Sequence, residues 1–431
     1  MKKNIAFIAL LLMAVFLTGQ AQSAKIVIVN ATIVPVVGAT LERGQILIEN
    51  GKIVALGEKL ENTLGAEVLD ASGMFVYPGL IDAFSRYGLA EISAIDGTVD
   101  ARELGKENPE LRAAWAINPQ SVHFGTGRCN GTTAALVAPA GKVFPGLAAL
   151  VKMDGWTFPE MALQETAASL INFPVSPRSR GEGGSSKTVE SKLDVTAKLV
   201  DKIKEFLAEA RFYLSRKAAA ERDRSLAMPE ADPKFEALAP VLAGQLPVII
   251  TVEKAKDIEL AIKFVREEKL KAIFRGCSQG FKVAEKIKAA GIPVIIDSLY
   301  QDPLEPEDGY DAPFRNVAEL VKAGVAVCFS SGDDPSAGKD LTYYAARAVA
   351  FGLDHQEAIK ALTIGAARIL GVADRLGSLE VGKDADLFIC TGDPLDIRSQ
   401  VKSIFINGKP VDMNNWWEQQ YSKWKNRPVR K

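Results

Sequence analysis

Short apolar segments alternate with helical stretches through the middle of the chain, and this alternation restricts the fold more than any other feature. Because the apolar segments have no polar face and are separated by helices such as 257–268, they predict a parallel sheet covered by helices. Their spread over roughly 300 residues favours a closed (β/α)8 barrel over an open doubly wound sheet. The expected strands are residues 75–81, 132–138, 147–153, 246–252, 270–274, 292–296 and 325–329.

Strand patterns also occur at both ends of the chain, at residues 26–29, 45–48, 52–56 and 67–70 and again at 386–390 and 401–408. The dipeptide Asn50-Gly51 lies between two of them and is typical of a tight β-hairpin. Two β-rich ends on a chain of this length most simply form one domain. We therefore expect a small β-sandwich from residues 25–78 and 376–413, and a barrel from residues 79–375.

Residues 1–24 have the pattern of a secretory signal peptide, with two lysines, an apolar run over 5–17 and small polar residues after it. The apolar run is shorter than the roughly 20 residues that a membrane-spanning helix needs. We therefore expect an exported protein, periplasmic or extracellular, without a membrane span.

Two further regions stand outside the barrel pattern. Residues 174–232 begin as a loop rich in Pro, Arg, Gly and Ser and continue as a charged helix, which predicts a solvated insertion. Residues 414–431 form an aromatic and basic tail, in which Trp417, Tyr421 and Trp424 recur at helical spacing. This tail is expected to pack on the body of the protein or, alternatively, to dock a partner.

Charge and cysteine content argue against several classes of protein. The chain has 52 Lys and Arg and 53 Asp and Glu residues, which favours neither nucleic acid nor an anionic membrane as a partner. The cysteines are widely spaced, so buried free thiols are expected rather than disulfides or a zinc cluster. They are Cys129, Cys277, Cys328 and Cys390.

The segment Tyr77-Pro78-Gly79-Leu80-Ile81-Asp82 is followed in order by the segments 246–250, 358–370 and 377–387. In residues and spacing these four segments resemble the amidohydrolase superfamily, specifically its imidazolonepropionase-like periplasmic branch, from about residue 26 to residue 411. The resemblance implies a TIM barrel flanked by a β-sandwich from both chain ends, which the strand pattern also predicts.

The same resemblance locates the positions where active members hold zinc or another divalent metal. Phe84 and Arg86 stand where a His-x-His pair is expected, and Thr251 and Arg275 stand near the next two histidine positions. The aspartate expected after the last strand is displaced to Asp333 and Asp334. Phenylalanine has no lone pair to donate and arginine repels a cation. We therefore expect no metal ligands and no bound cofactor.

The histidine content supports this expectation. The chain contains two histidines, His123 and His355, and neither matches a ligand position of the family. His355 is expected to be exposed at a helix N-terminus capped by Asp354, and His123 is expected in a loop or on the surface. Zinc activates water by lowering its pKa to about 7, and the sequence offers no obvious substitute for it.

Three other kinds of site are compatible with the sequence. Cys277 is a nucleophile if His123 acts as its base and Arg275 lowers the thiol pKa. A serine triad using Ser330 or Ser331 meets the same shortage of histidine, and the sequence has no GxSxG motif. An all-oxygen site for Ca²⁺ or Mg²⁺ would use Asp82, Asp297, Asp333 and Asp334.

The expected ligand is a small molecule, in particular an anion, because arginine clamps a carboxylate with two parallel hydrogen bonds. Its expected binding residues are Phe84, Arg86, Thr251 and Arg275. In the alternative reading, Arg86 pairs with Glu91 or Asp96 and only fills the former metal site.

We therefore predict a non-hydrolytic homologue that binds a small molecule, forms a homo-oligomer or pairs with an intact amidohydrolase. The alternative is a hydrolase of C–N bonds other than peptide bonds, acting on cyclic amides or small peptide-like compounds. Its rebuilt site would use Asp333, Asp334 and His123, with the two aspartates on the rim where barrel enzymes build their chemistry.

Overall fold

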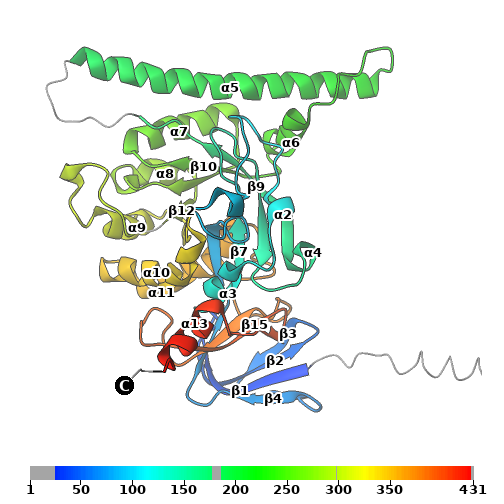
Figure 1. The fold of residues 1–431 in the computed structure, drawn as a ribbon, viewed down its shortest axis with the longest axis vertical. Coiled ribbons are helices and arrows are strands. Elements are labelled where there is room, and N and C mark those ends of the chain that lie inside the picture. Colours follow the sequence, from blue (N-terminus) through cyan, green and yellow to red (C-terminus); the bar gives the residue numbers. More distant parts are fainter. Residues whose placement is uncertain (1–24, 177–185, 298, 429–431) are drawn as a thin grey trace, which may run out of the picture.

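The computed structural model describes residues 25–176, 186–297 and 299–428, and these residues form two sheets of eight strands each. Figure 1 shows an elongated molecule with the barrel above the sheet built from the chain ends. The segment 1–24, predicted to be a signal peptide, lies outside the described residues. Every helix within the described ranges is too short or too polar to span a lipid bilayer.

The central sheet is a nearly closed barrel, which confirms the predicted (β/α)8 architecture. Its strands neighbour one another in chain order from β6 to β13, and β13 lies against β6. Across this seam the Ser331 N–H donates to Asp82 Oδ1 over 2.9 Å, and the Gly332 N–H donates to the Phe84 carbonyl over 3.1 Å. The strands are β6 (Leu80–Ser85), β7 (Thr132–Val137), β8 (Leu147–Lys152), β9 (Ala162–Asn172), β10 (Val248–Val252), β11 (Ala272–Gly276), β12 (Val294–Ile296) and β13 (Val327–Phe329).

The barrel differs from the predicted all-parallel sheet at β8, which runs antiparallel to both β7 and β9. The connections 138–146 and 153–161 are each shorter than about a dozen residues, so neither can hold the crossover that a parallel pair requires. The sequence prediction also missed β9, because its first half carries the polar residues Gln164, Glu165 and Thr166.

The second sheet combines both ends of the chain, as predicted. Asn50 at φ 52° and Gly51 at φ 77° form the expected tight turn between β2 and β3. The predicted strand 75–81 divides at Gly79, where an added Cβ would lie only 2.0 Å from Thr133 Oγ1. The strands are β1 (Lys25–Ile33), β2 (Leu41–Glu49), β3 (Lys52–Gly57), β4 (Glu67–Asp70), β5 (Phe75–Pro78), β14 (Leu387–Cys390), β15 (Val401–Ile406) and β16 (Lys409–Pro410).

Helices lie along the outside of the barrel (Figure 1). The α-helices are α2 (Ala113–Ala116), α3 (Val122–Arg128), α4 (Phe158–Met161), α5 (Ser186–Arg222), α6 (Pro233–Leu242), α7 (Ala255–Glu268), α8 (Ala284–Ala290), α9 (Ala312–Lys322), α10 (Leu341–Ala350), α11 (His355–Leu362), α12 (Ile364–Ile369) and α13 (Trp416–Lys425). The 3-10 helices are η1 (Asp96–Thr98), η2 (Gly280–Lys282), η3 (Pro306–Asp308) and η4 (Pro335–Asp340).

The long helix α5 crosses the end of the molecule that lies farthest from the terminal sheet (Figure 1). It extends beyond the predicted helix at both ends and is not wholly solvated. Its residues Val200, Ile203 and Leu207 are buried, and Arg211 pairs with Glu268 of α7 over 2.6 Å. One face of this insertion is therefore docked on the barrel helices.

A buried ion cluster joins the barrel to the terminal sheet. Because β8 is reversed, its last residue Lys152 lies opposite Ala134, near the start of β7. The Lys152 ammonium donates to Asp384 over 2.8 Å, to Asp386 over 2.9 Å and to Asn407 Oδ1 over 2.6 Å. Lys152 and the two aspartates are almost fully buried, so these charges depend on one another for solvation.

Candidate functional site

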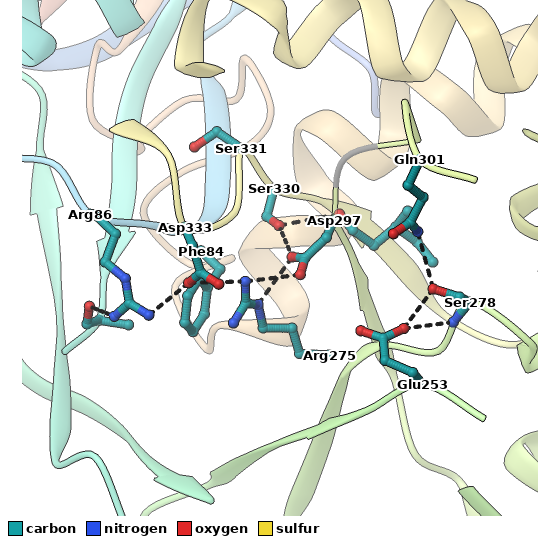
Figure 2. Close-up of polar contacts among 12 residues, drawn as sticks. Phe84, Arg86, Glu253, Arg275, Ser278, Asp297, Gln301, Ser330, Ser331 and Asp333 are labelled. Carbon is teal, nitrogen blue, oxygen red and sulfur yellow. Dashed lines mark hydrogen bonds and ion pairs between the residues drawn. The ribbon is translucent and has the colours of Figure 1, made fainter. Parts of the chain in front are cut away.

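Charged side chains gather where the parallel barrel strands end, at the barrel mouth (Figure 2). Phe84 and Arg86 come from the end of β6, and Arg275 comes from the end of β11. Asp297 follows β12 directly, and Asp333 lies in the loop after β13. This edge of a barrel is where the active sites of barrel enzymes are built.

Arg275 is the centre of this cluster. Its Cζ lies 3.6 Å from the centroid of the Phe84 ring, so the guanidinium covers the aromatic face. Its Nε donates to Asp297 Oδ1 over 3.0 Å and its second terminal nitrogen contacts Asp297 Oδ2 at 2.8 Å, a two-pronged ion pair. The same nitrogen lies 3.2 Å from Asp333 Oδ1. Only 6% of the Arg275 side chain is exposed, so its charge is neutralised inside the protein.

Arg86 completes the cluster from the other side of Asp333. It donates to Asp333 Oδ1 over 2.6 Å and also to the carbonyl of Ala138. The predicted pairing of Arg86 with Glu91 or Asp96 is therefore wrong, because the acid that neutralises Arg86 comes from the last barrel loop. Partial desolvation opposes ionisation of Asp333, but the Arg275 and Arg86 guanidinium groups more than offset it and lower the pKa of this carboxyl.

Thr251 and Asp334, the other two predicted site residues, occupy different positions. Thr251 pairs in register with Arg275 across β10 and β11, so both side chains leave the sheet on the same face. Asp334 lies outside the cluster, since its carboxylate caps η4 by accepting from the Ser336 N–H over 2.9 Å. The structure thus brings Phe84, Arg86, Arg275 and Asp333 together and places Asp334 at a helix start.

The residues of the mouth do not fit a divalent metal. The Arg275 guanidinium occupies the space between Asp297 and Asp333, the Arg86 guanidinium lies on the other side of Asp333, and each acid is already paired with an arginine. Within residues 25–176, 186–297 and 299–428, no three His, Cys, Asp or Glu side chains converge as metal ligands. A zinc ion at this place would face two cations and an aromatic ring in place of nitrogen or thiolate donors.

The alternative oxygen-ligand site is also not assembled. Asp82 is fully buried and accepts from the Ser331 N–H over 2.9 Å and from Ser331 Oγ over 2.6 Å. Burial raises the pKa of Asp82 to about 6, although the bonds from Ser331 act in the opposite direction. Asp297 and Asp333 are paired with arginines and Asp334 caps a helix, so the four predicted carboxylates have separate roles.

Glu253 is a mouth residue that the sequence prediction missed. Its Oε2 accepts from Ser278 Oγ over 2.6 Å and from the Ser278 N–H over 3.1 Å, while Gln301 donates to Ser278 Oγ over 3.0 Å (Figure 2). Burial raises the pKa of Glu253. Its position directly after β10, two residues beyond Thr251, was the available signal.

The predicted cysteine nucleophile does not have the environment that it needs. Cys277 is fully buried, and burial raises its thiol pKa well above the usual range, so Arg275 does not produce a thiolate there. His123, its proposed base, is buried rather than in a surface loop, and its Nε2 lies 2.8 Å from the Glu91 carbonyl oxygen. Ser330 donates to Asp297 over 2.6 Å and Ser331 to Asp82, so neither serine contacts a histidine.

Several smaller predictions can also be compared with the structure. His355 lies at the start of α11, which Asp354 caps as predicted, and its Nε2 contacts Asp393 at 2.6 Å. The four cysteines are free, and all except the half-buried Cys129 are buried.

The aromatic tail forms the predicted helix, α13, but does not bury its aromatic residues. Trp417, Tyr421 and Trp424 are each more than half exposed, and no residue of α13 is buried. The helix contacts α3, so the tail lies against the body of the protein as expected, although these three rings stay more than half exposed.

Comparisons with known proteins agree with the fold. A sequence profile described as the Amidohydrolase family matches residues 282–411. Over 398 residues the chain is 22% identical to Amidohydrolase tasK of Hapsidospora irregularis, and this match covers 85% of the chain but 39% of that relative. Over 110 residues it is 34% identical to Imidazolonepropionase of Porphyromonas gingivalis, which covers 24% of the chain and 26% of that enzyme.

The solved structure of an amidohydrolase from Thermotoga maritima MSB8 resembles the chain over most of its length. It has a TM-score of 0.80 and 26% identity, covering 90% of this chain and 99% of that one. The structure of molinate hydrolase, at 18% identity and a TM-score of 0.53, shares the fold. The chain spans about two fifths of the length of the first curated relative, so the similarity concerns this region and not the whole of that protein.

Proposed function

Because the chain belongs to the amidohydrolase superfamily, we propose that it is a non-hydrolytic member whose barrel mouth binds a small anionic ligand through Arg86 and Arg275. The observation that carries this proposal is the Arg275 guanidinium, stacked on Phe84 and paired with two aspartates where metal ligands would have to converge. Hydrolysis by metal-activated water requires nitrogen or oxygen donors at that place.

The arginines support anion binding because they are rigidly held. Arg275 is fixed by the Phe84 ring and by both oxygens of Asp297, and Arg86 is fixed by the Ala138 carbonyl. Guanidinium groups that are already oriented lose little conformational entropy when they bind a carboxylate. The same contacts also agree with the alternative that the two arginines only fill the former metal site. A binding experiment distinguishes ligand binding from this filling role.

A hydrolase of C–N bonds is the second candidate, and Glu253 is the observation that favours it. Glu253 is a partly buried carboxyl at the mouth, its pKa is raised by desolvation, and it is hydrogen-bonded to the hydroxyl of Ser278. Carboxyl groups with raised pKa values at a barrel rim are typical of general acids and bases. The names of the relatives, among them imidazolonepropionase and dihydroorotase, are those of enzymes.

Two expectations from the sequence extend the proposal. We propose that the protein acts outside the cytoplasm, on the basis of the pattern in residues 1–24. We also propose that it acts as a homo-oligomer or beside a catalytically intact relative, and the exposed aromatic face of α13 is one surface available for such a contact.

Metal analysis of the purified protein, combined with a hydrolysis screen, tests the proposal. Lactams, hydantoins and dipeptides are offered with and without added Zn²⁺ or Mn²⁺. We expect no stoichiometric transition metal and no turnover. About one tightly held metal per chain, together with turnover, would overturn the proposal. Turnover without metal that disappears in Glu253→Gln but persists in Glu259→Gln, on the exposed surface of α7, would establish the second candidate.

A further inference from the structure

Asp333 differs from Arg86, Arg275 and Asp297, the other members of the ion-pair cluster, in how firmly it is held. Its side chain is 62% exposed, whereas those of Arg86, Arg275 and Asp297 are 10%, 6% and 22% exposed. Both of its ion pairs use one oxygen, Oδ1, which lies 2.6 Å from Arg86 and 3.2 Å from Arg275. Asp333 is therefore the most exposed group of the cluster, and Figure 2 shows its carboxylate between Arg86 and Arg275.

Asp297 is held in a different way. Both of its oxygens contact Arg275, and Oδ1 also accepts from Ser330 Oγ over 2.6 Å. A ligand would have to break all of these contacts at once to replace it, so Asp297 is a permanent part of the site.

Asp333 can leave its position without any movement of the backbone. The loop is anchored on both sides of Asp333, since Ser331 is bonded to Asp82 and Asp334 caps η4. The Gly332 N–H is bonded to the Phe84 carbonyl, which holds the loop against β6. Because the Asp333 side chain faces solvent, rotation about its own bonds is enough to move Oδ1 away from the arginines.

The charges of the mouth determine what can replace Asp333. Within the cluster of Arg86, Arg275, Asp297 and Asp333, removal of Asp333 leaves a net charge of +1, so a single negative charge restores the neutrality of the cluster. Glu253 is not counted in this cluster, because its carboxyl is hydrogen-bonded to Ser278 and burial raises its pKa. The group that occupies the place in the structure is a carboxylate. We propose that Asp333 is an internal carboxylate that shields Arg86 and Arg275, and that the ligand of the mouth is a small monocarboxylate that takes its place. This inference rests on the proposed function and specifies its ligand.

An acetate titration tests the inference, with acetamide as the uncharged probe and inorganic phosphate as the competing anion. The thermal unfolding midpoint is followed at constant ionic strength for the wild-type protein and for Asp333→Asn. Asp374→Asn, which removes a charge from an exposed position elsewhere, is the matched control. Asp333→Ser serves as a second variant if Asp333→Asn folds poorly.

We expect Asp333→Asn to respond to acetate at a concentration at least about tenfold lower than wild type or Asp374→Asn, because the tethered competitor is gone. The response disappears when Arg86→Gln is added, and acetamide gives none. An acetate response that is equal in Asp333→Asn and Asp374→Asn, or a stronger response to phosphate than to acetate, would overturn the inference. Metal analysis of the same samples tests the proposed function separately, because a bound transition metal refutes that function whatever the acetate result.

Discussion

Replacing Arg275 by Gln is expected to destabilise the protein strongly, because the change leaves Asp297 without its two-pronged partner. Only 6% of the Arg275 side chain and 22% of the Asp297 side chain are exposed, so water replaces the lost contacts poorly. Removing one partner of a buried ion pair costs about 3–5 kcal/mol. The guanidinium on the Phe84 ring contributes about 1–2 kcal/mol of that stabilisation, and Arg275→Lys should lose part of it together with the two-pronged geometry.

The assay is urea unfolding at pH 7, followed by circular dichroism. Arg112→Gln, which breaks an exposed pair with Glu165, is the matched control and should cost about 0–1 kcal/mol. In an Asp297→Asn background the cost of Arg275→Gln should fall by about 1–3 kcal/mol, because the two residues share one interaction. A loss from Arg275→Gln no larger than that of Arg112→Gln would refute the claim that Arg275 and Asp297 form a desolvated ion pair at the mouth.

Two further predictions concern buried charges elsewhere in the barrel. Burial raises the pKa of Asp82 from an ordinary 3.8 to about 6 in the folded protein. Between pH 3.8 and pH 6 the folded protein therefore keeps a proton on this carboxyl that the unfolded chain has lost. The free energy of unfolding should therefore fall by about 3 kcal/mol as the pH rises from about 4 to about 6. A series of urea titrations across this pH range measures the fall, and Asp82→Asn should reduce it. An equal fall in the wild-type protein and in Asp82→Asn would contradict the raised pKa of Asp82. Lys152→Met leaves Asp384 and Asp386 buried without their shared cation, so it should lower the free energy of unfolding by about 3–5 kcal/mol in urea titration. Lys52→Met, which removes a half-exposed partner of the same Asp384, should cost about 0–1 kcal/mol, and equal losses would disprove the special role of Lys152.

Much of the fold could be predicted because its signals are local. Asn50-Gly51 requires a left-handed turn, and the apolar segments require burial on both faces, whatever their neighbours are. The direction of β8 was not predictable from its residues, since an apolar run reads the same in either direction, and only the short connections on both sides of it carry that information.

The candidate site shows the same division between local and long-range information. The barrel prediction alone places Phe84, Arg86 and Arg275 on one rim. The partner of Arg86 depends on the loop after β13, which is 247 positions away in sequence, so the nearer acids Glu91 and Asp96 were the wrong choice. The stacking of Arg275 on Phe84 likewise depends on how the barrel closes, which no local pattern specifies.

A crystal structure of the protein grown with Zn²⁺, with anomalous diffraction measured at the zinc edge, tests the central claim most directly. The Arg275 guanidinium should lie on the Phe84 ring between Asp297 and Asp333, with no anomalous peak at the barrel mouth. A zinc peak coordinated at that place, with Arg275 displaced from Phe84, would contradict the account.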